Sequence, residues 1–254
     1  MVTHDPIVVL HGFLGGSASF VDVIAAFPAP ISPLAPTLYG HTGVAEGATT
    51  YSFETEADRL LCLIRRHFAG IAVHLVGYSL GGRLGLSLLL RAPSLFRSAT
   101  LVCARRGLDT PEERSDRSKA DLMWAHRLRT EPLTDFLDAW ESQSIFSSMH
   151  RLPQAKLRRL RDQRLSHDSE ALAQAIIGLS LSNMPSYAAD LARVQLPVTL
   201  VSGSLDDKFT HLAEDLAARL PKSRTIVVTD AGHNLPLERP DAIASAMIEG
   251  MNHA

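Results

Sequence analysis

The 254-residue sequence predicts an α/β protein built on a mostly parallel sheet that is covered by helices on both faces. Short runs of β-branched and aliphatic residues recur along the chain, and helix-like segments separate them. Strands that are apolar along their whole length are typical of a parallel sheet buried on both faces. One long interval lacks such runs, and this predicts an inserted helical segment.

The apolar runs and the segments between them are assigned in chain order. Strands are expected at residues 7–10, 73–76, 99–102, 198–201 and 225–228. Helices are expected at residues 53–68, 83–90, 212–220 and 241–251. This alternation of strand and helix favours a doubly wound sheet.

Residues 105–190 interrupt this alternation, because they show helical periodicity and many charges but no convincing strand. We therefore expect a core formed by residues 1–104 and 191–254, with residues 105–190 inserted as a helical cap. Residues 105–164 contain thirteen Lys and Arg against ten Asp and Glu, whereas the rest of the chain contains twelve against seventeen. Positive charge is thus concentrated in the cap, where solvated helix faces account for most of it.

Composition excludes several classes of function. A formal charge of −2 lacks the strong basicity of a nucleic-acid-binding protein. No segment approaches the roughly 20 apolar residues of a membrane span, and residues 1–6 lack a basic signal region. We expect a cytoplasmic protein without membrane or nucleic-acid partners, and its oligomeric state stays open. Cys62 and Cys103 are expected to be small buried hydrophobic residues.

The motif Gly-Tyr-Ser-Leu-Gly at residues 77–81 lies between an apolar strand and a helix. A turn of this kind presents its serine, here Ser79, at a tight strand-to-helix corner. The same fold requires an acid and then a histidine after later strands. His233 fits as the base, while Asp206 and Asp207 compete for the acid role; spacing from the strand favours Asp206 without excluding Asp207.

Two backbone N–H groups are expected to form an oxyanion hole. One belongs to Leu80, the residue after the serine, and the other to Phe13 in the glycine-containing loop after the first strand. Arg83 lies four residues after Ser79, on the same helix face. Its guanidinium suits a carboxylate ligand, although a surface position is an equal alternative at this point.

Longer stretches of the chain resemble one enzyme family. Residues 75–83 are similar to the motif of the 2-succinyl-6-hydroxy-2,4-cyclohexadiene-1-carboxylate synthases, which are lyases of menaquinone biosynthesis in the α/β-hydrolase superfamily. The resemblance extends from about Val8 to His233, and its matches include residues 113–117, 129–133, 138–140, 145–148, 160–161, 206–209 and 231–234. It implies an α/β-hydrolase fold with a mostly parallel sheet, helices on both faces and an inserted helical cap.

The resemblance also implies a reaction and a set of roles. The reaction is elimination of pyruvate from 2-succinyl-5-enolpyruvyl-6-hydroxy-3-cyclohexene-1-carboxylate, a tricarboxylate, with no metal or organic cofactor. Ser79, Asp206 and His233 match the catalytic triad, with Ser79 acting as a base. The positions that match substrate-binding residues are Tyr78, Arg83, Arg117, Trp140 and Arg161, with the arginines holding carboxylates.

The chain departs from the family pattern at two places. Residues 37–43 read Thr-Leu-Tyr-Gly-His-Thr-Gly where Asp-Leu-Pro-Gly-His-Gly is common, and Glu141 replaces a tyrosine. A hydrolase of an ester, thioester or carbon–carbon bond in an acidic small molecule is therefore the main alternative, because the same triad serves both reactions. A non-catalytic receptor is a second alternative. The positions of Arg117 and Arg161 distinguish the synthase from the hydrolase. If both side chains point into the pocket with Arg83, a polyanionic ligand is favoured; if they face solvent, the hydrolase is favoured.

Overall fold

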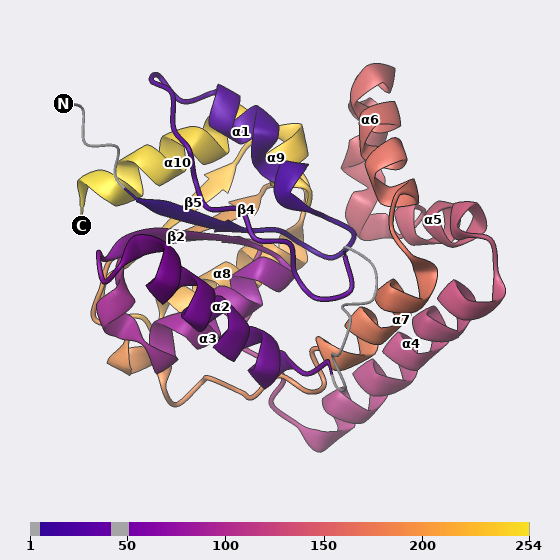
Figure 1. Cartoon of the computed structure of the whole chain (residues 1–254), viewed down its shortest axis with the longest axis horizontal. Helices are drawn as coiled ribbons and strands as arrows, with labels where there is room; N and C mark the ends of the chain where they lie inside the picture. The colour runs from indigo at the N-terminus through magenta and orange to yellow at the C-terminus, as the bar shows by residue number, and fades with distance from the viewer. Residues whose placement is uncertain (1–5, 42–50, 254) are drawn as a thin grey trace.

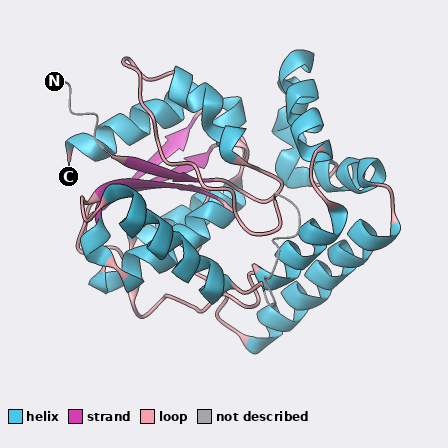
Figure 2. Cartoon of the chain, viewed as in Figure 1, coloured by secondary structure: helices cyan, strands magenta, loops and turns pink. Residues whose placement is uncertain are grey.

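The computed structural model describes residues 6–41 and 51–253, and it confirms the predicted α/β fold (Figures 1 and 2). The sheet has five strands in the order β1-β2-β3-β4-β5, and every neighbouring pair is parallel. The strands are β1 (Ile7–Leu10), β2 (Val73–Tyr78), β3 (Phe96–Val102), β4 (Val198–Gly203) and β5 (Ser223–Val228). All five coincide with the expected apolar runs.

Helices cover both faces of the sheet. On one face Figure 1 shows α1 (Val21–Ala25), α9 (Leu235–Glu238) and α10 (Pro240–Asn252). The other face carries α2 (Phe53–Phe68), α3 (Leu80–Arg91) and α8 (Asp207–Ala217). Short 3-10 turns lie at η1 (Ser17–Phe20), η2 (Pro93–Leu95) and η4 (Leu191–Arg193). Helix α8 begins five residues earlier than expected, because the Asp206 side chain accepts a hydrogen bond from the Phe209 N–H and caps the helix.

Successive side chains of a strand point to opposite faces of the sheet, and this explains why the core is divided into two hydrophobic clusters. In β1, Val8 and Leu10 belong to the cluster that packs on α2 and α3, whereas Ile7 and Val9 belong to the cluster that packs on α1 and α10. Both sets are buried, so β1 is apolar on both faces, as expected for a strand of a parallel sheet that is covered by helices on both sides. The sheet therefore holds its carboxyl edge, where the predicted site residues lie, between two packed layers.

The cap consists of α4 (Pro111–Thr130), α5 (Leu133–Glu141), η3 (Ser144–Arg151), α6 (Gln154–Leu165) and α7 (Ser169–Gly178). These helices stand to one side of the sheet in Figure 1. They enclose a hydrophobic cluster of their own that contains Phe136, Leu172 and Ile176. Leu14, from the loop after β1, packs into the same cluster and ties the cap to the core. The exact domain boundaries at residues 105 and 190 stay a prediction.

The two cysteines differ in their exposure to solvent. Cys103 is buried as expected, but Cys62 is exposed, because it falls on the polar side of α2. Within residues 6–41 and 51–253, no helix combines the length and hydrophobicity needed to cross a membrane.

Candidate active site

Ser79 occupies a strained corner between β2 and α3. Its backbone has φ 52° and ψ −106°, a region that non-glycine residues rarely adopt. The corner is possible because its glycines leave no room for side chains: a Cβ on Gly81 would lie 2.1 Å from the Leu10 carbonyl oxygen, and one on Gly77 would lie 2.5 Å from the Gly81 carbonyl oxygen. The strand-turn-helix arrangement predicted around Ser79 is therefore present.

The three predicted triad residues meet at the carboxyl edge of the sheet. The His233 Nε2 atom lies 3.2 Å from Ser79 Oγ, and Nδ1 of the same ring lies 2.8 Å from Asp206 Oδ2. The other carboxylate oxygen of Asp206 accepts a hydrogen bond from the Phe209 N–H at 3.2 Å. Asp206 is buried, whereas Asp207 is exposed and does not reach the imidazole. Only Asp206 is thus placed to orient His233.

Glu238, at the end of α9, holds the loop that carries His233. Its two carboxylate oxygens accept hydrogen bonds from the N–H groups of Gly232 and Asn234, at 2.8 and 3.0 Å. The imidazole itself is enclosed by the rings of Phe209 and Tyr78, whose centroids lie 4.5 and 5.5 Å away. These contacts fix the ring position and limit water access. Sequence reasoning did not identify Glu238, because a carboxylate in a short helix carries no recognisable motif.

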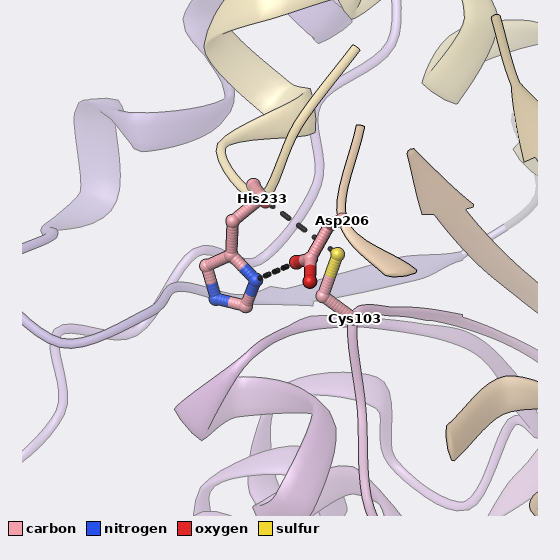
Figure 3. Close-up of side chains that lie close together, drawn as sticks. All are labelled: Cys103, Asp206 and His233. Carbon is pink, nitrogen blue, oxygen red and sulfur yellow. Dashed lines mark hydrogen bonds and ion pairs between the residues drawn. The ribbon is translucent and has the colours of Figure 1, made fainter. Parts of the chain in front are cut away.

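Cys103 lies beside the triad acid, as Figure 3 shows. Cys103, Asp206 and His233 hold potential metal ligands within 4.8 Å of one another. All three are already engaged, however: Asp206 with His233, and the thiol with the His233 carbonyl oxygen at 3.5 Å. Burial and the negative charge of Asp206 raise the pKa of Cys103 well above its usual value. Because a metal needs the thiolate, the cluster favours a proton relay over a metal site.

The expected oxyanion donors face the same cavity as Ser79. Phe13 and Leu80 both line it, and Leu80 is the first residue of α3, so its N–H has no acceptor within the helix. The Phe13 N–H has no acceptor among residues 6–41 and 51–253. A Cβ on Gly12 would lie 2.7 Å from the Tyr78 ring, so glycine allows the loop to approach the serine.

Two buried histidines support this loop, and their place in the site was not expected from the sequence. The Nε2 atom of His11 accepts a hydrogen bond from the Leu38 N–H at 3.0 Å, and Nε2 of His41 accepts one from the Leu14 N–H at 3.1 Å. Because each peptide N–H can only donate, both rings are neutral with the proton on Nδ1, which faces a backbone carbonyl. Thr42 and Gly43, the end of the unusual segment that contains His41, lie outside the described residues.

The pKa values of these rings follow from their positions. Burial lowers the pKa of His11 to about 4. Burial also lowers the pKa of His41 well below 6.5, and the nearby His11 and His167 rings lower it further. Both histidines therefore remain neutral at the pH of the cell and act as fixed hydrogen-bonding groups.

A cavity of about 650 Å³ opens on Ser79 and lies between the core and the cap. Tyr78, Arg83, Arg117 and Trp140, which were predicted to bind the substrate, all line it. Burial and the nearby Arg117 guanidinium lower the pKa of Arg83 to about 9, while Asp121 raises it. Arg83 donates to the Leu179 carbonyl oxygen at 3.1 Å, so its alternative as a surface arginine does not hold.

Arg161 is the one predicted substrate-binding residue that does not line the cavity. Its guanidinium instead pairs with Asp138 at 2.7 Å and with Glu141 at 3.3 Å. Arg164, one helical turn further along α6, is buried, lines the cavity and donates to Glu141 at 2.7 Å. Glu141, the departure from the family pattern, is therefore paired with arginine. The positions of Arg117 and Arg161 were expected to distinguish a polyanion-binding enzyme from a hydrolase, and they give a mixed result: Arg117 lines the pocket and Arg161 does not.

The neutral histidines predict a loss of stability in acid. Because the folded-state pKa of His11 lies below the value of about 6.5 expected in the unfolded chain, the unfolded state binds more protons between pH 6.5 and 4. Stability is thus fully present above pH 6.5 and is lost as the pH falls. For His11 alone we expect a loss of roughly 2 kcal/mol between pH 7 and pH 5, with a further loss from His41.

Urea unfolding at a series of pH values measures this effect. His41→Gln keeps an acceptor and a donor but cannot titrate, so its stability should fall less steeply with acid than that of the wild type. His126→Gln, at an exposed position on α4, is the matched control and should keep the wild-type slope. Equal slopes in all three proteins would contradict the assignment.

Comparisons with known proteins agree with this geometry. The model of the α/β hydrolase family matches residues 7–246. The 2-succinyl-6-hydroxy-2,4-cyclohexadiene-1-carboxylate synthase of Escherichia coli O1:K1 is 31% identical over 96% of this chain and 92% of its own length. The enzyme of the same name from Enterobacter sp. strain 638 is also 31% identical, over 96% of this chain and 90% of its own length.

Solved structures show the same fold. MenH from S. aureus superposes with a TM-score of 0.93 at 24% identity, covering 99% of this chain and 95% of its own. A thermophilic esterase from Thermogutta terrifontis gives a TM-score of 0.82 at 24% identity, over 98% and 91% of the two chains. At this identity the structures establish the fold alone. With the family model and the curated relatives, they show that the chain belongs to the α/β-hydrolase family and, within it, to the 2-succinyl-6-hydroxy-2,4-cyclohexadiene-1-carboxylate synthases.

Proposed function

We propose that the protein eliminates pyruvate from 2-succinyl-5-enolpyruvyl-6-hydroxy-3-cyclohexene-1-carboxylate and releases 2-succinyl-6-hydroxy-2,4-cyclohexadiene-1-carboxylate. The observation that carries this proposal is an arginine-lined cavity that opens directly on the Ser79–His233–Asp206 relay. Curated relatives that span more than nine-tenths of the chain bear the name of this synthase and support the assignment.

The cavity suits a substrate with three carboxylates. Arg83 and Arg117 lie close enough to repel each other, and an incoming carboxylate relieves that repulsion. Arg164 offers a third guanidinium in the cavity wall, although it is also paired with Glu141. Each arginine can form charge-assisted hydrogen bonds in a site partly closed from water. Binding of the carboxylates thus places the substrate ring near Ser79.

The chemical step begins with proton removal. His233 Nε2 accepts the hydroxyl proton of Ser79 while Oγ takes a proton from a ring carbon of the substrate, and Asp206 stabilises the imidazolium that forms. Negative charge then develops on the conjugated succinyl carbonyl. The N–H groups of Phe13 and Leu80 are the donors assigned to that oxygen.

Elimination completes the reaction. The electron pair left by the abstracted proton forms a double bond from that carbon into the ring, the existing ring double bond shifts by one position, and the carbon–oxygen bond to the enolpyruvyl group breaks. The proton held by the relay passes to the departing group, which leaves as pyruvate. No covalent bond to Ser79 forms at any step, and no water is consumed. This separates the reaction from ester hydrolysis, in which the same oxygen would attack a carbonyl carbon.

A small-molecule substrate fits the family. Cytoplasmic localisation and the lack of nucleic-acid and membrane partners stay predictions from the sequence. A turnover measurement tests the alternative function, a non-catalytic receptor.

Pyruvate release from freshly prepared substrate, coupled to lactate dehydrogenase and corrected for spontaneous decay, tests the proposed function. We expect wild-type turnover, a loss of at least about 10³-fold in Ser79→Ala because the proton acceptor is removed, and unchanged activity in Ser115→Ala, an exposed control on α4. A neutral-ester panel is run in parallel. Ester turnover without pyruvate release would assign the protein to the hydrolases, and no turnover of either kind would favour a receptor.

The placement of α6 predicts a contrast between two neighbouring arginines. Arg164→Gln should raise the KM for pyruvate release by about tenfold, because it removes a charged donor from the cavity wall. Arg161→Gln removes the same charge from outside the cavity and should change KM by less than about threefold. Steady-state kinetics of both variants measure the contrast. A larger effect at Arg161 would mean that the cap binds substrate in another arrangement.

A further inference from the structure

The cations that line the cavity fall into two groups. Within residues 6–41 and 51–253, six Lys and Arg side chains and three Asp side chains line it. Three of the cations are already paired with a carboxylate: Arg117 with Asp121, Arg159 with Asp22, and Arg164 with Glu141. Among the described residues, no carboxylate pairs with the other three, which are Arg83, Arg105 and Lys208. The proposed mechanism uses Arg83 but gives no role to Arg105 or Lys208.

Arg105 and Lys208 leave neighbouring strands on the same side of the cavity. Arg105 follows β3 and Lys208 lies in the first turn of α8, directly after β4, and these two strands pair in parallel. Ser79 follows β2, the strand on the other side of β3, so the two cations lie at the same sheet edge as the reacting atoms. Arg105 stands at the boundary between the core and the expected cap, and both side chains reach the cavity from segments that follow β3 and β4.

The surroundings of the two side chains suit an anion. Arg105 donates from Nε and from a terminal nitrogen to the Gly107 carbonyl oxygen, at 3.3 and 3.1 Å, which holds the guanidinium in place and leaves other N–H donors unused. Lys208 is exposed where the cavity meets solvent. The acid beside it, Asp207, also lines the cavity and is exposed, but it forms no ion pair with either cation.

Repulsion between their positive charges raises the free energy of Arg105 and Lys208 when no anion lies between them. Although Lys208 is exposed, partial desolvation of its ammonium at the cavity opening lowers its pKa, and the positive charges of Arg105 and Arg117 lower it further. Burial likewise lowers the pKa of Arg105; the Glu113 carboxylate opposes this shift, and the Arg117 guanidinium adds to it. Nearby carboxylates, Glu113 for Arg105 and Asp206 for Lys208, partly offset this repulsion without forming an ion pair with either cation. Cations that repel one another and have no ion-pair partner gain from an anionic ligand placed between them.

We propose that Arg105 and Lys208 form a carboxylate-binding subsite on the β3–β4 side of the cavity, separate from the cap arginines. The identity of the ligand rests on the proposed function: the subsite holds one of the three carboxylates of the substrate while Arg83 and Arg117 hold another. The planar guanidinium sets the orientation of the carboxylate, and the flexible ammonium supplies charge at the cavity opening. Together they fix which face of the ring is presented to Ser79.

The test measures binding of a tricarboxylate probe independently of turnover. Propane-1,2,3-tricarboxylate is titrated at constant ionic strength, and the fluorescence of Trp140 in the cavity wall reports binding. We expect Arg105→Gln to raise the Kd about tenfold, Lys208→Gln about three- to tenfold, and the double variant more than either. Lys119→Gln, which removes one charge from an exposed site on α4, is the control and should change Kd by less than about twofold. The neutral trimethyl ester should not discriminate among the proteins.

Kinetics then connect the subsite to the reaction. In pyruvate release, Arg105→Gln and Lys208→Gln should raise KM by similar factors with kcat within about threefold of wild type. If the two variants bind the probe more weakly but the wild type releases no pyruvate, the subsite is upheld and the proposed function is overturned. If the wild type releases pyruvate, but Arg105→Gln and Lys208→Gln have the same KM and the same probe Kd as Lys119→Gln, the subsite is overturned and the proposed function stands. Failure of the wild type to bind the probe at millimolar concentration would also overturn it.

Discussion

The contact between Gly81 and the Leu10 carbonyl is the constraint on which the rest of the site depends. Any Cβ at position 81 would lie 2.1 Å from that oxygen, so the end of β1 meets the first turn of α3 backbone against backbone. The contact places the loop that carries Phe13 beside the helix start that carries Leu80. It also fixes the corner at which Ser79 adopts its positive φ. A single close packing therefore positions the proton acceptor and both assigned oxyanion donors.

The cap is connected to this corner through the same loop. Gln163 of α6 donates to the Leu14 carbonyl oxygen at 3.4 Å and to the His167 ring at 3.2 Å. His167 in turn donates to the His41 carbonyl oxygen at 2.6 Å, and His41 accepts the Leu14 N–H. Leu14 also packs into the hydrophobic cluster of the cap. The loop that carries Phe13, the proposed oxyanion donor, is thus held from both sides, as the proposed alignment of the donors requires.

The sequence predicts the core of the site because local patterns encode it. The serine motif follows an apolar strand, and His233 follows a later one, so chain order alone assigns both. Spacing from the strand favours Asp206 over Asp207 but does not decide between them. It depends on which carboxylate is buried to cap α8 and reach the imidazole, and the family resemblance supplied that choice before the structure did.

Other features required the packed structure. Motif matching finds helix α6 but not the arginine on it that faces the cavity, because Arg161 and Arg164 lie three residues apart and their exposure depends on how the helix docks. The roles of His11, His41 and Glu238 come from hydrogen bonds to backbone groups of distant segments, which leave no periodic signal. Arg105 and Lys208 likewise become neighbours only when β3 and β4 pair.

The central claim is that Ser79 removes a ring proton and does not attack a carbonyl. Single-turnover pyruvate release with enzyme in excess tests it, using substrate that carries deuterium at the ring carbon from which the proton is taken. Product release does not limit the rate under this condition, so breakage of the carbon–hydrogen bond is visible. We expect severalfold slower release from the deuterated substrate. Equal rates for the two substrates, together with a covalent adduct on Ser79, would contradict it.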